Sequence, residues 1–548
     1  MQFQSIAVLL FPSPMDCFSM VNISWYGGAS VTSQHWPMNH LDVKSQPFII
    51  SNLTKNPNAY GSVLERYFLA STGVTVMVAS DIPFSLSIEE NKHFCLESLH
   101  GSEMDSLQYT VCVSPNITSA HQEVGSQLSG KQRRMPETDL LRLPVWRYSG
   151  AADTAAEMDE GLHTFSDDLQ AHLMEGLIIL NEQSTMLLRN MDHKHSPTMP
   201  RRKKLAMDYS FIKPLKLSIT LSPYASIHSQ LFQTSLQEGR EDFWLSHHSE
   251  PGDYLVPLLT RWKGQFSARL NVTSQAAILW YMEQARLLKQ QLGAEYVVFE
   301  GGEGNLFVEQ AIPPPTELRG ERYLCSLALM AAALGNSSII SAGSRTSHLP
   351  LFLQMNPRQS DWSYAGLKGI IPSVLHHSLL GYNFFIPDAT GGSLGSKFLV
   401  DEELYIRWLQ IAMFLPVMSF GVPPWTCCAD WVSNLTRHYI QRHQDFVVPL
   451  IEKYGKEWVS TGYPIFRPIW WLSPHEPIAF TIDDEFLIGD EVLVAPITEQ
   501  GQSQRDIYLP GEGQKWMDTN TAQVFDGGAF IRNYSVTLLD VPVFLKTY

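Results

Sequence analysis

Short apolar strands alternate with helix-length segments from about residue 140 to about residue 460, and this alternation constrains the fold more than any other feature. The strand candidates are apolar runs at 177–180, 217–221, 296–299, 338–341 and 383–386. Between two of them, segment 274–293 places Ala277, Tyr281 and Leu288 on one helical face. Strands separated by helices of this length form a parallel sheet, and we expect an α/β fold built on a (β/α)8 barrel.

Short strands with turn signals flank this region on both sides. The N-terminal strand candidates are the hairpin-like stretch 67–79 and the alternating stretch 82–88, and the C-terminal ones are 478–482, 492–496, 506–509 and 541–544. The polar stretch 119–134 is expected to be a linker. We therefore predict three domains, an N-terminal β-sandwich-like domain at 1–135, the barrel at 136–463 and a small C-terminal β-domain at 464–548.

The composition is that of a globular protein with an acidic surface. Of the 548 residues, 44% are hydrophobic and 17% are charged, and the net charge is −16. Nucleic-acid binding requires a basic footprint, so we expect no nucleic-acid partner. The one basic run, 201–204, lies in a polar segment with nearby Pro residues and is expected to be a solvated loop.

Glycosylation signals indicate a lumenal or extracellular protein. N-x-Ser/Thr sequons occur along the whole chain, at Asn22, Asn52, Asn116, Asn271, Asn336, Asn434 and Asn533. No run reaches the roughly 18 apolar residues of a membrane span. The apolar run 6–11 is too short for a signal peptide. We expect a leader or anchor outside this chain, and membrane association only through such an anchor.

The cysteine pattern favours disulfide or free-thiol roles over metal binding. None of the six cysteines forms a C-x-x-C pair, so no metal site is predicted. Cys17 with Cys95 or Cys112 is suited to a disulfide in an oxidising compartment, and buried free thiols are the alternative. Phosphate-loop motifs are missing as well, and we expect no cofactor.

Several long stretches, in order along the chain, resemble glycoside hydrolase family 31. They are RWKGQFSARLNVTSQAAILWYMEQARLLKQQLGAEYVVFEGGEGN at 261–305, GIIPSVLHHSLLGYNFFIPDATGG at 369–392, ELYIRWLQIAMFLPVMSFGVPP at 403–424 and the blocks RPIWWLSP and IDDEFLIGDEVLVAP within 462–496. Near the N-terminus, WYGGASVTSQHWP and YGSVLERYFLAS are similar to the branch of myogenesis-regulating glycosidase and SITS-binding protein. The resemblance implies the fold of this family and the activity of a retaining α-glycosidase, which hydrolyses O-glycosyl bonds.

The resemblance places the two catalytic carboxylates at positions that this chain has altered. A retaining glycosidase needs a nucleophile and a general acid/base about 5–5.5 Å apart. The nucleophile position holds Glu300, where the family pattern has Asp. The acid/base position falls on Asn356 or Pro357, depending on the direction of counting, and neither side chain can donate a proton to a leaving oxygen. Asp361 is the nearest carboxylate, and a helix N-cap or surface role is the simpler interpretation for it.

Other positions that match the family pattern are candidates for contacts with a sugar. They are Trp146, Asn181, Glu182, Trp262, Glu303 and Asp388. The two tryptophans would stack on a sugar ring, and the polar residues would bind hydroxyl groups. For Asp388, a structural role as an acceptor for loop amides is an equally good interpretation, and Glu303 is as well suited to supporting its own loop.

Three functions remain open from the sequence. The first is an active glycosidase that uses Glu300 and another acid. The second is a pseudoenzyme that binds a glycan or a small anionic ligand, and the third is a receptor or scaffold ectodomain. Fold alone does not decide between them. The substitution at Asn356 and Pro357 favours weak or absent hydrolysis, with a carbohydrate or another small polar molecule as the ligand.

Overall fold

The structure, a computed structural model, describes residues 3–7, 15–79, 82–98, 107–125, 127–128, 132–189, 213–246, 256–302, 321–335, 337–395 and 401–547. The predicted residues Glu303 and Asn336 and the basic run 201–204 lie outside the described residues. The chain divides into two compact units. Unit 1 comprises Met1–Arg142, Ser344–His348 and Met355–Tyr548, and unit 2 comprises Leu143–Gly343 and Leu349–Gln354.

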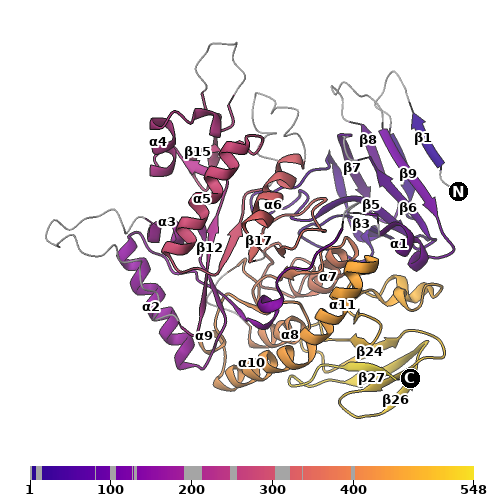
Figure 1. The fold of residues 1–548 in the computed structure, drawn as a ribbon. Coiled ribbons are helices and arrows are strands. Elements are labelled where there is room, and N and C mark those ends of the chain that lie inside the picture. Colours follow the sequence, from indigo (N-terminus) through magenta and orange to yellow (C-terminus); the bar gives the residue numbers. More distant parts are fainter. Residues whose placement is uncertain are drawn as a thin grey trace. The chain divides into compact units, whose positions relative to one another are not determined.

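Unit 2 contains the first strands of a parallel sheet (Figure 1). They are β10 (Val145–Arg147), β11 (Leu177–Ile179), β12 (Lys216–Leu221), β16 (Tyr296–Phe299), β17 (Ser338–Ile340) and β18 (Phe352–Gln354), each paired in parallel with the next. The strand residues are almost all buried, which explains why they read as continuous apolar runs rather than alternating ones.

Helices follow these strands as the sequence predicts. They are α2 (Ala155–Ala171), α3 (Glu182–Arg189), α4 (Gln230–Gln237), α5 (Gln275–Gln291) and α6 (Arg322–Leu334). Helix α5 begins where the Ser274 hydroxyl accepts the Ala277 N–H, and it buries Tyr281 and Leu288 on the expected face. A three-stranded antiparallel sheet, in the order β13-β15-β14, is inserted after β12. Its strands are β13 (Tyr224–Ser226), β14 (Leu259–Trp262) and β15 (Gln265–Arg269).

The eight-stranded sheet has the order β19-β18-β17-β16-β12-β11-β10-β20, which is the order of a nearly closed (β/α)8 barrel. Its end strands are β19 (Phe385–Ile386) and β20 (Ser419–Phe420), and a parallel bridge joins Thr390 to Phe420 beside them. The helices of this part are α7 (Ile370–Leu379), α8 (Glu402–Ala412), α9 (Pro424–Cys427), α10 (Asp430–Arg442) and α11 (Val448–Thr461). The predicted barrel is confirmed.

The N-terminal strands form two antiparallel sheets, with the orders β1-β9-β6-β5-β3 and β2-β8-β7-β4. The strands are β1 (Phe3–Ala7), β2 (Met15–Ser19), β3 (Trp25–Ala29), β4 (Val43–Pro47), β5 (Leu64–Ala70), β6 (Val74–Val78), β7 (Phe84–Glu89), β8 (His93–Ser98) and β9 (Leu107–Val113). The stretch 119–134 is not all linker, because α1 (Ile117–Gly125) covers its beginning. Ile117, Ala120 and Val124 are buried at helical spacing among polar residues, which explains why the stretch was misinterpreted.

The C-terminal strands form a six-stranded sheet in the order β21-β22-β23-β28-β25-β26, and a two-stranded sheet of β24 and β27. They are β21 (Phe466–Arg467), β22 (Phe486–Ile488), β23 (Val492–Val494), β24 (Gln504–Leu509), β25 (Lys515–Asp518), β26 (Val524–Asp526), β27 (Ala529–Ser535) and β28 (Val543–Thr547). The expected strand at 478–482 is wrong, because Pro477–Phe480 forms a 3-10 helix with proline in its first turn. The predicted β-rich ends are confirmed, and the three domain boundaries stay a prediction.

Candidate functional site

Three neighbouring strands of unit 2 end in side chains that meet. Glu182 follows β11, Ser222 follows β12 and Glu300 follows β16. The register pairs the last residue of β12, Leu221, with the last residue of β16, Phe299, so the next residues of these strands emerge side by side. Because the strands are parallel, these polar groups gather at one edge of the sheet, where barrel enzymes carry their chemistry.

Lys263 joins the two carboxylates of this edge. Its Nζ atom lies 3.0 Å from Glu182 Oε2 and donates a hydrogen bond to Glu300 Oε1. The side chain of Glu300 is 26% exposed and that of Lys263 is 45% exposed, so the pair borders solvent. Lys263 is not among the site residues predicted from the sequence. The signal was present, because the Lys263–Gly264 dipeptide separates two short strands at the spacing of a tight hairpin.

The hairpin β14–β15 explains how Lys263 reaches Glu300. Lys263 and Gly264 are its two turn residues, with φ values of 46° and 85°. Two successive positive φ values are typical of the turns that match the twist of a two-residue hairpin. The turn lies directly after Trp262, so the lysine is fixed at the tip of a short, rigid element.

Glu182 is buried and serves as the acceptor that organises this edge. Its Oε1 atom accepts a hydrogen bond from the Ser222 hydroxyl, and its Oε2 atom accepts from Trp262 Nε1 at 2.8 Å and from Lys263. All three neighbours donate, so the carboxylate acts as an acceptor in each of these contacts. Glu182 therefore positions Trp262 and Lys263 and does not replace a general acid.

The charge of Lys263 is retained in this environment. Burial by itself lowers the pKa of the amine, but the negative charges of Glu300 and Glu182 outweigh burial, and the net pKa lies above its ordinary value. The ammonium ion therefore remains paired with Glu300 at neutral pH. A nucleophile in a covalent glycosidase attacks as a carboxylate, and a bound ammonium ion reduces the electron density available for that attack.

Two aromatic rings pack under the backbone of the Glu300 loop. Trp262 and Tyr224 stack with ring centroids 4.4 Å apart and an interplanar angle of 14°. Gly301 has a φ of 83°, and a Cβ atom there would lie 2.9 Å from Tyr224 and 3.0 Å from Trp262. Glycine after Glu300 is therefore required both by the backbone conformation and by the rings. Trp262 is 7% exposed, so most of its ring is already in contact with protein.

Asn356 has both ends of its amide engaged within unit 1. Its Oδ1 atom accepts the Ser62 N–H at 3.1 Å, and its Nδ2 atom donates to the Ser30 hydroxyl at 3.3 Å. The contact with this loop is close, since a Cβ atom at Gly61 would lie 2.4 Å from Asn356 Nδ2. Pro357, in contrast, is exposed. The amide of Asn356 thus holds the loops of the N-terminal strands.

Asp388, two residues after β19, accepts hydrogen bonds from a loop. Its Oδ2 atom accepts the Arg358 N–H at 2.8 Å, the Ser393 N–H at 3.0 Å and the Ser393 hydroxyl at 2.8 Å. These contacts are those of the structural acceptor that the sequence left open. A sugar contact by Asp388 stays a prediction.

The guanidinium group of Arg358 is enclosed below this loop. It donates to the Tyr364 and Gly366 carbonyl oxygens at 3.3 Å and to the Ser373 hydroxyl of α7. Burial lowers the pKa of Arg358 to about 10, and the charge of Asp388 opposes that shift. The group remains charged at neutral pH.

The remaining predicted residues have mainly structural contacts here. Trp146 is 1% exposed and donates its indole N–H to the Glu175 carbonyl at 2.9 Å, so it has no free face for a sugar in this structure. Asn181 is exposed and its Oδ1 atom accepts the Ser184 N–H at 2.8 Å, as the cap of α3. Their sugar-binding roles stay predictions. Asp361 is exposed and its Oδ1 atom accepts the Ser363 N–H at 2.9 Å.

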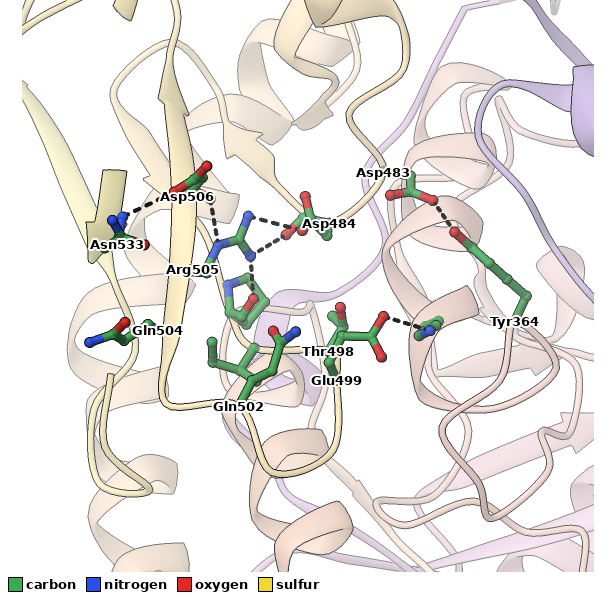
Figure 2. Close-up of a pocket in the computed structure, with 13 residues that line it drawn as sticks. Tyr364, Asp483, Asp484, Thr498, Glu499, Gln502, Gln504, Arg505, Asp506 and Asn533 are labelled. Atoms are coloured by element: carbon green, nitrogen blue, oxygen red, sulfur yellow. Dashed lines mark hydrogen bonds and ion pairs between the residues drawn. The ribbon is translucent and has the colours of Figure 1, made fainter. Parts of the chain in front are cut away.

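A separate polar cavity of about 450 Å³ lies within unit 1 (Figure 2). Its lining includes Tyr364, whose hydroxyl donates to Asp483 at 2.7 Å, and Lys368, whose amine lies 2.6 Å from Glu499. Figure 2 shows Arg505 extending toward Asp484. Its Nη2 atom lies 3.1 Å from Asp484 Oδ2. Burial raises the pKa of Asp483, and the Tyr364 hydroxyl opposes this shift. Sequence analysis gave no indication of this cavity.

Cys17 and Cys95 form a disulfide, which confirms one of the two pairings open from the sequence. Among the described residues, the one group of three potential metal ligands is Cys17, His93 and Cys95. The disulfide already uses both sulfur atoms of that group. The part of the chain that the structure describes has no helix with the length and hydropathy of a membrane span.

Comparison with known proteins identifies the family. The glycosyl hydrolase family 31 C-terminal domain matches residues 462–547. The chain is 52% identical to SITS-binding protein of Tetronarce californica, over 97% of this chain and 75% of that protein. It is 29% identical to myogenesis-regulating glycosidase of Mus musculus, over 95% of this chain and 74% of that protein.

The fold of a solved enzyme agrees. The cycloalternan-forming enzyme of Listeria monocytogenes, in complex with a pentasaccharide substrate, superposes with a TM-score of 0.74 at 17% identity, over 97% of this chain and 53% of that enzyme. The barrel, the terminal β-sheets and these similarities together show that the chain belongs to glycoside hydrolase family 31.

Proposed function

We propose that the protein binds carbohydrate in a site of the retaining α-glycosidase type and hydrolyses O-glycosyl bonds weakly or not at all. The observation that carries this proposal is the state of Asn356, whose amide is bound at both ends by Ser30 and Ser62. The family resemblance places the general acid/base at this residue or at Pro357. Neither side chain can protonate a leaving oxygen, so the step that needs an acid has no donor at this position.

The Glu300 edge supports the same proposal from the nucleophile side. Glu300 would attack the anomeric carbon as a carboxylate, but Lys263 binds that carboxylate. The side chain is also one methylene longer than the family's Asp, and a misplacement of about 1 Å can cost roughly 100-fold in rate. Both effects lower the rate of attack by Glu300.

A panel of aryl α-glycosides and natural disaccharides tests the proposal. Loss of general acid catalysis costs about 10²–10⁴-fold, and a dinitrophenolate leaving group needs little protonation. We expect residual hydrolysis on dinitrophenyl α-glycosides, loss of it in Glu300→Ala, and almost none on disaccharides. Efficient disaccharide turnover by the unmodified protein would contradict the proposal and would point to another acid, with Asp361→Ala as the variant to examine next.

A pseudoenzyme that only binds its ligand is the second candidate, and the Lys263–Glu300 pair favours it. A nucleophile paired with an ammonium ion is less reactive but still offers hydrogen-bonding groups to a hydroxyl. Calorimetric titration with the same sugars separates the two candidates, because the pseudoenzyme gives a binding isotherm with no product. Absence of both binding and turnover would leave the scaffold or receptor hypothesis.

We also propose that the protein functions in the secretory lumen or on the extracellular face. The Cys17–Cys95 disulfide supports this location, and so do the exposed sequon residues Asn22, Asn434 and Asn533. Asn533 borders the polar cavity of unit 1. Secretory expression with a supplied leader should give a gel band that shifts on enzymatic deglycosylation. An unchanged band would argue for the cytosol.

A further inference from the structure

Two adjacent cysteines in unit 1 have their sulfur atoms almost in contact. Cys427 is the last residue of α9 and Cys428 follows it, and the Sγ atoms are 2.6 Å apart. Both side chains are half-buried. This is a pair of thiols aimed at each other, and it plays no part in the functions described above.

The local backbone explains why the two side chains converge. In extended chain, successive side chains point to opposite faces. Here α9 ends at Cys427, and Cys428 has φ −134° and ψ 170°, so the change from helix to extended backbone falls at this pair. The turn is held by the Cys428 N–H, which donates to the Pro424 carbonyl at 3.1 Å.

A contact with a neighbouring helix fixes the far side of the pair. The Ala429 N–H, directly after the cysteines, donates to Glu402 Oε2 of α8 at 2.8 Å. The Cys427 thiol also approaches the Pro424 carbonyl at 3.7 Å. The convergence of the sulfur atoms is therefore set by contacts on both sides of the dipeptide.

The two thiols differ in acidity. A hydrogen bond from Cys428 lowers the pKa of Cys427, although burial opposes it. The hydrogen bond to Cys427 raises the pKa of Cys428, and burial adds to that rise. The thiolate is the reactive form of cysteine, so Cys427 is the attacking sulfur.

We propose that Cys427 and Cys428 are a redox site that closes reversibly to a disulfide between adjacent residues. The oxidant is a low-molecular-weight disulfide such as oxidised glutathione. The Cys427 thiolate attacks one sulfur of the oxidant and displaces a first thiolate, which leaves a mixed disulfide on Cys427. Cys428 loses its proton, attacks the Cys427 sulfur and displaces the second thiolate. The two protein thiols are oxidised to one disulfide, and the oxidant is reduced to two thiols that take up the two protons.

Covalent geometry makes this disulfide easy to reduce. The Cα atoms of adjacent residues lie about 3.8 Å apart across a trans peptide, below the usual range of about 4.4–6.8 Å for disulfides. A bond outside that range is strained and is more readily reduced. The Cα atoms of Cys17 and Cys95 are 4.1 Å apart, which is nearer to that range, and the two residues are 78 positions apart on paired strands, so adjacency in the chain adds no constraint to their disulfide. We expect the adjacent pair to open first as reductant is added.

Peptide mapping tests the proposal on the whole protein, secreted with a supplied leader and kept free of reductant. The protein is exposed to oxidised glutathione, unfolded in the presence of an alkylating reagent, deglycosylated because Asn434 lies in the tryptic peptide 408–437, and digested. We expect that peptide to carry no alkyl group and to be lighter by two hydrogen atoms than the dithiol form. Cys112 and Cys325, which lie outside the Cys17–Cys95 disulfide and outside the adjacent pair, should be alkylated as internal controls.

Matched variants and a reductant titration complete the test. In Cys427→Ser, Cys428 should become alkylated or glutathionylated, and Cys428→Ser should expose Cys427 in the same way. Stepwise addition of a dithiol reductant should add alkyl groups at 427 and 428 before 17 and 95. Two results would overturn the proposal. One is complete alkylation of both cysteines after the oxidant, and the other is a disulfide from either cysteine to another residue or another chain.

Discussion

The neighbourhoods of Glu300 and Asn356 treat their polar groups in opposite ways. Around Glu300, charged side chains pair with one another, and Lys263 is still 45% exposed. Around Asn356, an uncharged amide is bound to Ser30 and to the backbone of Ser62. Exposed ion pairs contribute little to stability, whereas a polar group satisfied inside the protein is costly to remove. The side chains around Glu300 therefore remain able to react with a ligand, whereas the side chain of Asn356 has a structural role.

The most direct test of this contrast is to place an acid at each candidate position for the general acid/base. In a Glu300→Asp background, we expect Pro357→Asp to raise disaccharide hydrolysis by about 100-fold or more, since general acid catalysis contributes roughly 10²–10⁴-fold. Asn356→Asp should give no comparable gain, because the Ser62 N–H and the Ser30 hydroxyl already engage both ends of that side chain. Steady-state rates on one disaccharide measure both variants.

The outcome identifies which residue occupies the acid position. If Asn356→Asp restores hydrolysis and Pro357→Asp does not, the bridge to Ser30 and Ser62 is not the obstacle described above. A gain that persists in Glu300→Ala would exclude a covalent mechanism through residue 300.

The effects on stability should also differ between the Glu300 edge and the loop that joins Asp388 to Arg358. Asp388→Ala removes the acceptor of three hydrogen bonds beside the buried Arg358 charge, and we expect it to lower the free energy of unfolding by about 3 kcal/mol. Glu300→Ala should cost less than about 1 kcal/mol, because its partner Lys263 is partly exposed. Urea unfolding of both variants makes the measurement. Equal losses in the free energy of unfolding would contradict the view that Asp388 has a structural role and Glu300 does not.

Acid should weaken the Arg358 neighbourhood in particular. Burial, together with the Arg358 charge, lowers the pKa of His377 to about 4, although the Ser373 carbonyl opposes the shift. His376, next to it on α7, also has its pKa lowered by burial and by His377. A lowered folded-state pKa means that the stability is present above the unfolded value of about 6.5 and is lost as the pH falls toward 4.

We expect the free energy of unfolding to fall by about 1.4 kcal/mol per pH unit for His377 across that window. Urea unfolding at pH 7, 6 and 5 measures the slope. His377→Asn, which keeps a donor for the Ser373 carbonyl, should reduce it. A slope that is unchanged in this variant would show that His377 is not the group that titrates.

The smallest expected effects distinguish Asn356 from Lys263, because one variant should change stability and the other should change hydrolysis or sugar affinity. Asn356→Ala should cost about 1 kcal/mol of stability through the unpaired Ser62 N–H and change residual aryl-glycoside hydrolysis little. Lys263→Met should leave stability nearly unchanged and alter hydrolysis or sugar affinity through Glu300. Thermal unfolding and initial rates on the same samples are sufficient. A loss of hydrolysis in Asn356→Ala together with a loss of stability in Lys263→Met would contradict these roles.

The barrel was predictable because buried parallel strands appear in the sequence as uninterrupted apolar runs. The runs at 177–180 and 296–299 correspond to β11 and β16 within one residue, and segment 274–293 corresponds to α5. The prediction of a strand at 478–482 was wrong, because Pro477 favours a 3-10 helix, which the alternation of apolar residues does not reveal. Local pattern identifies elements best where many residues repeat the same environment.

The site was less predictable because its contacts join residues distant in the chain. Family resemblance located Glu300 and Glu182, and the Lys263–Gly264 dipeptide indicates a hairpin turn, but the sequence does not indicate that this turn lies between the two carboxylates. Asn356 similarly contacts residues 294 and 326 positions away. Arg358 was missed because a charged residue in a polar loop is normally solvated, whereas here the loop encloses it.

The hairpin turn at Lys263 carries an evolutionary implication. Its φ of 46° is a conformation that glycine and asparagine adopt with less strain than lysine. Lys263→Gly or Lys263→Asn would therefore relax the backbone while releasing both carboxylates from their shared cation. Residue 263 thus determines whether a cation lies between Glu182 and Glu300. Selection for stability alone would favour glycine or asparagine at position 263. Selection for an unreactive Glu300 would favour lysine there.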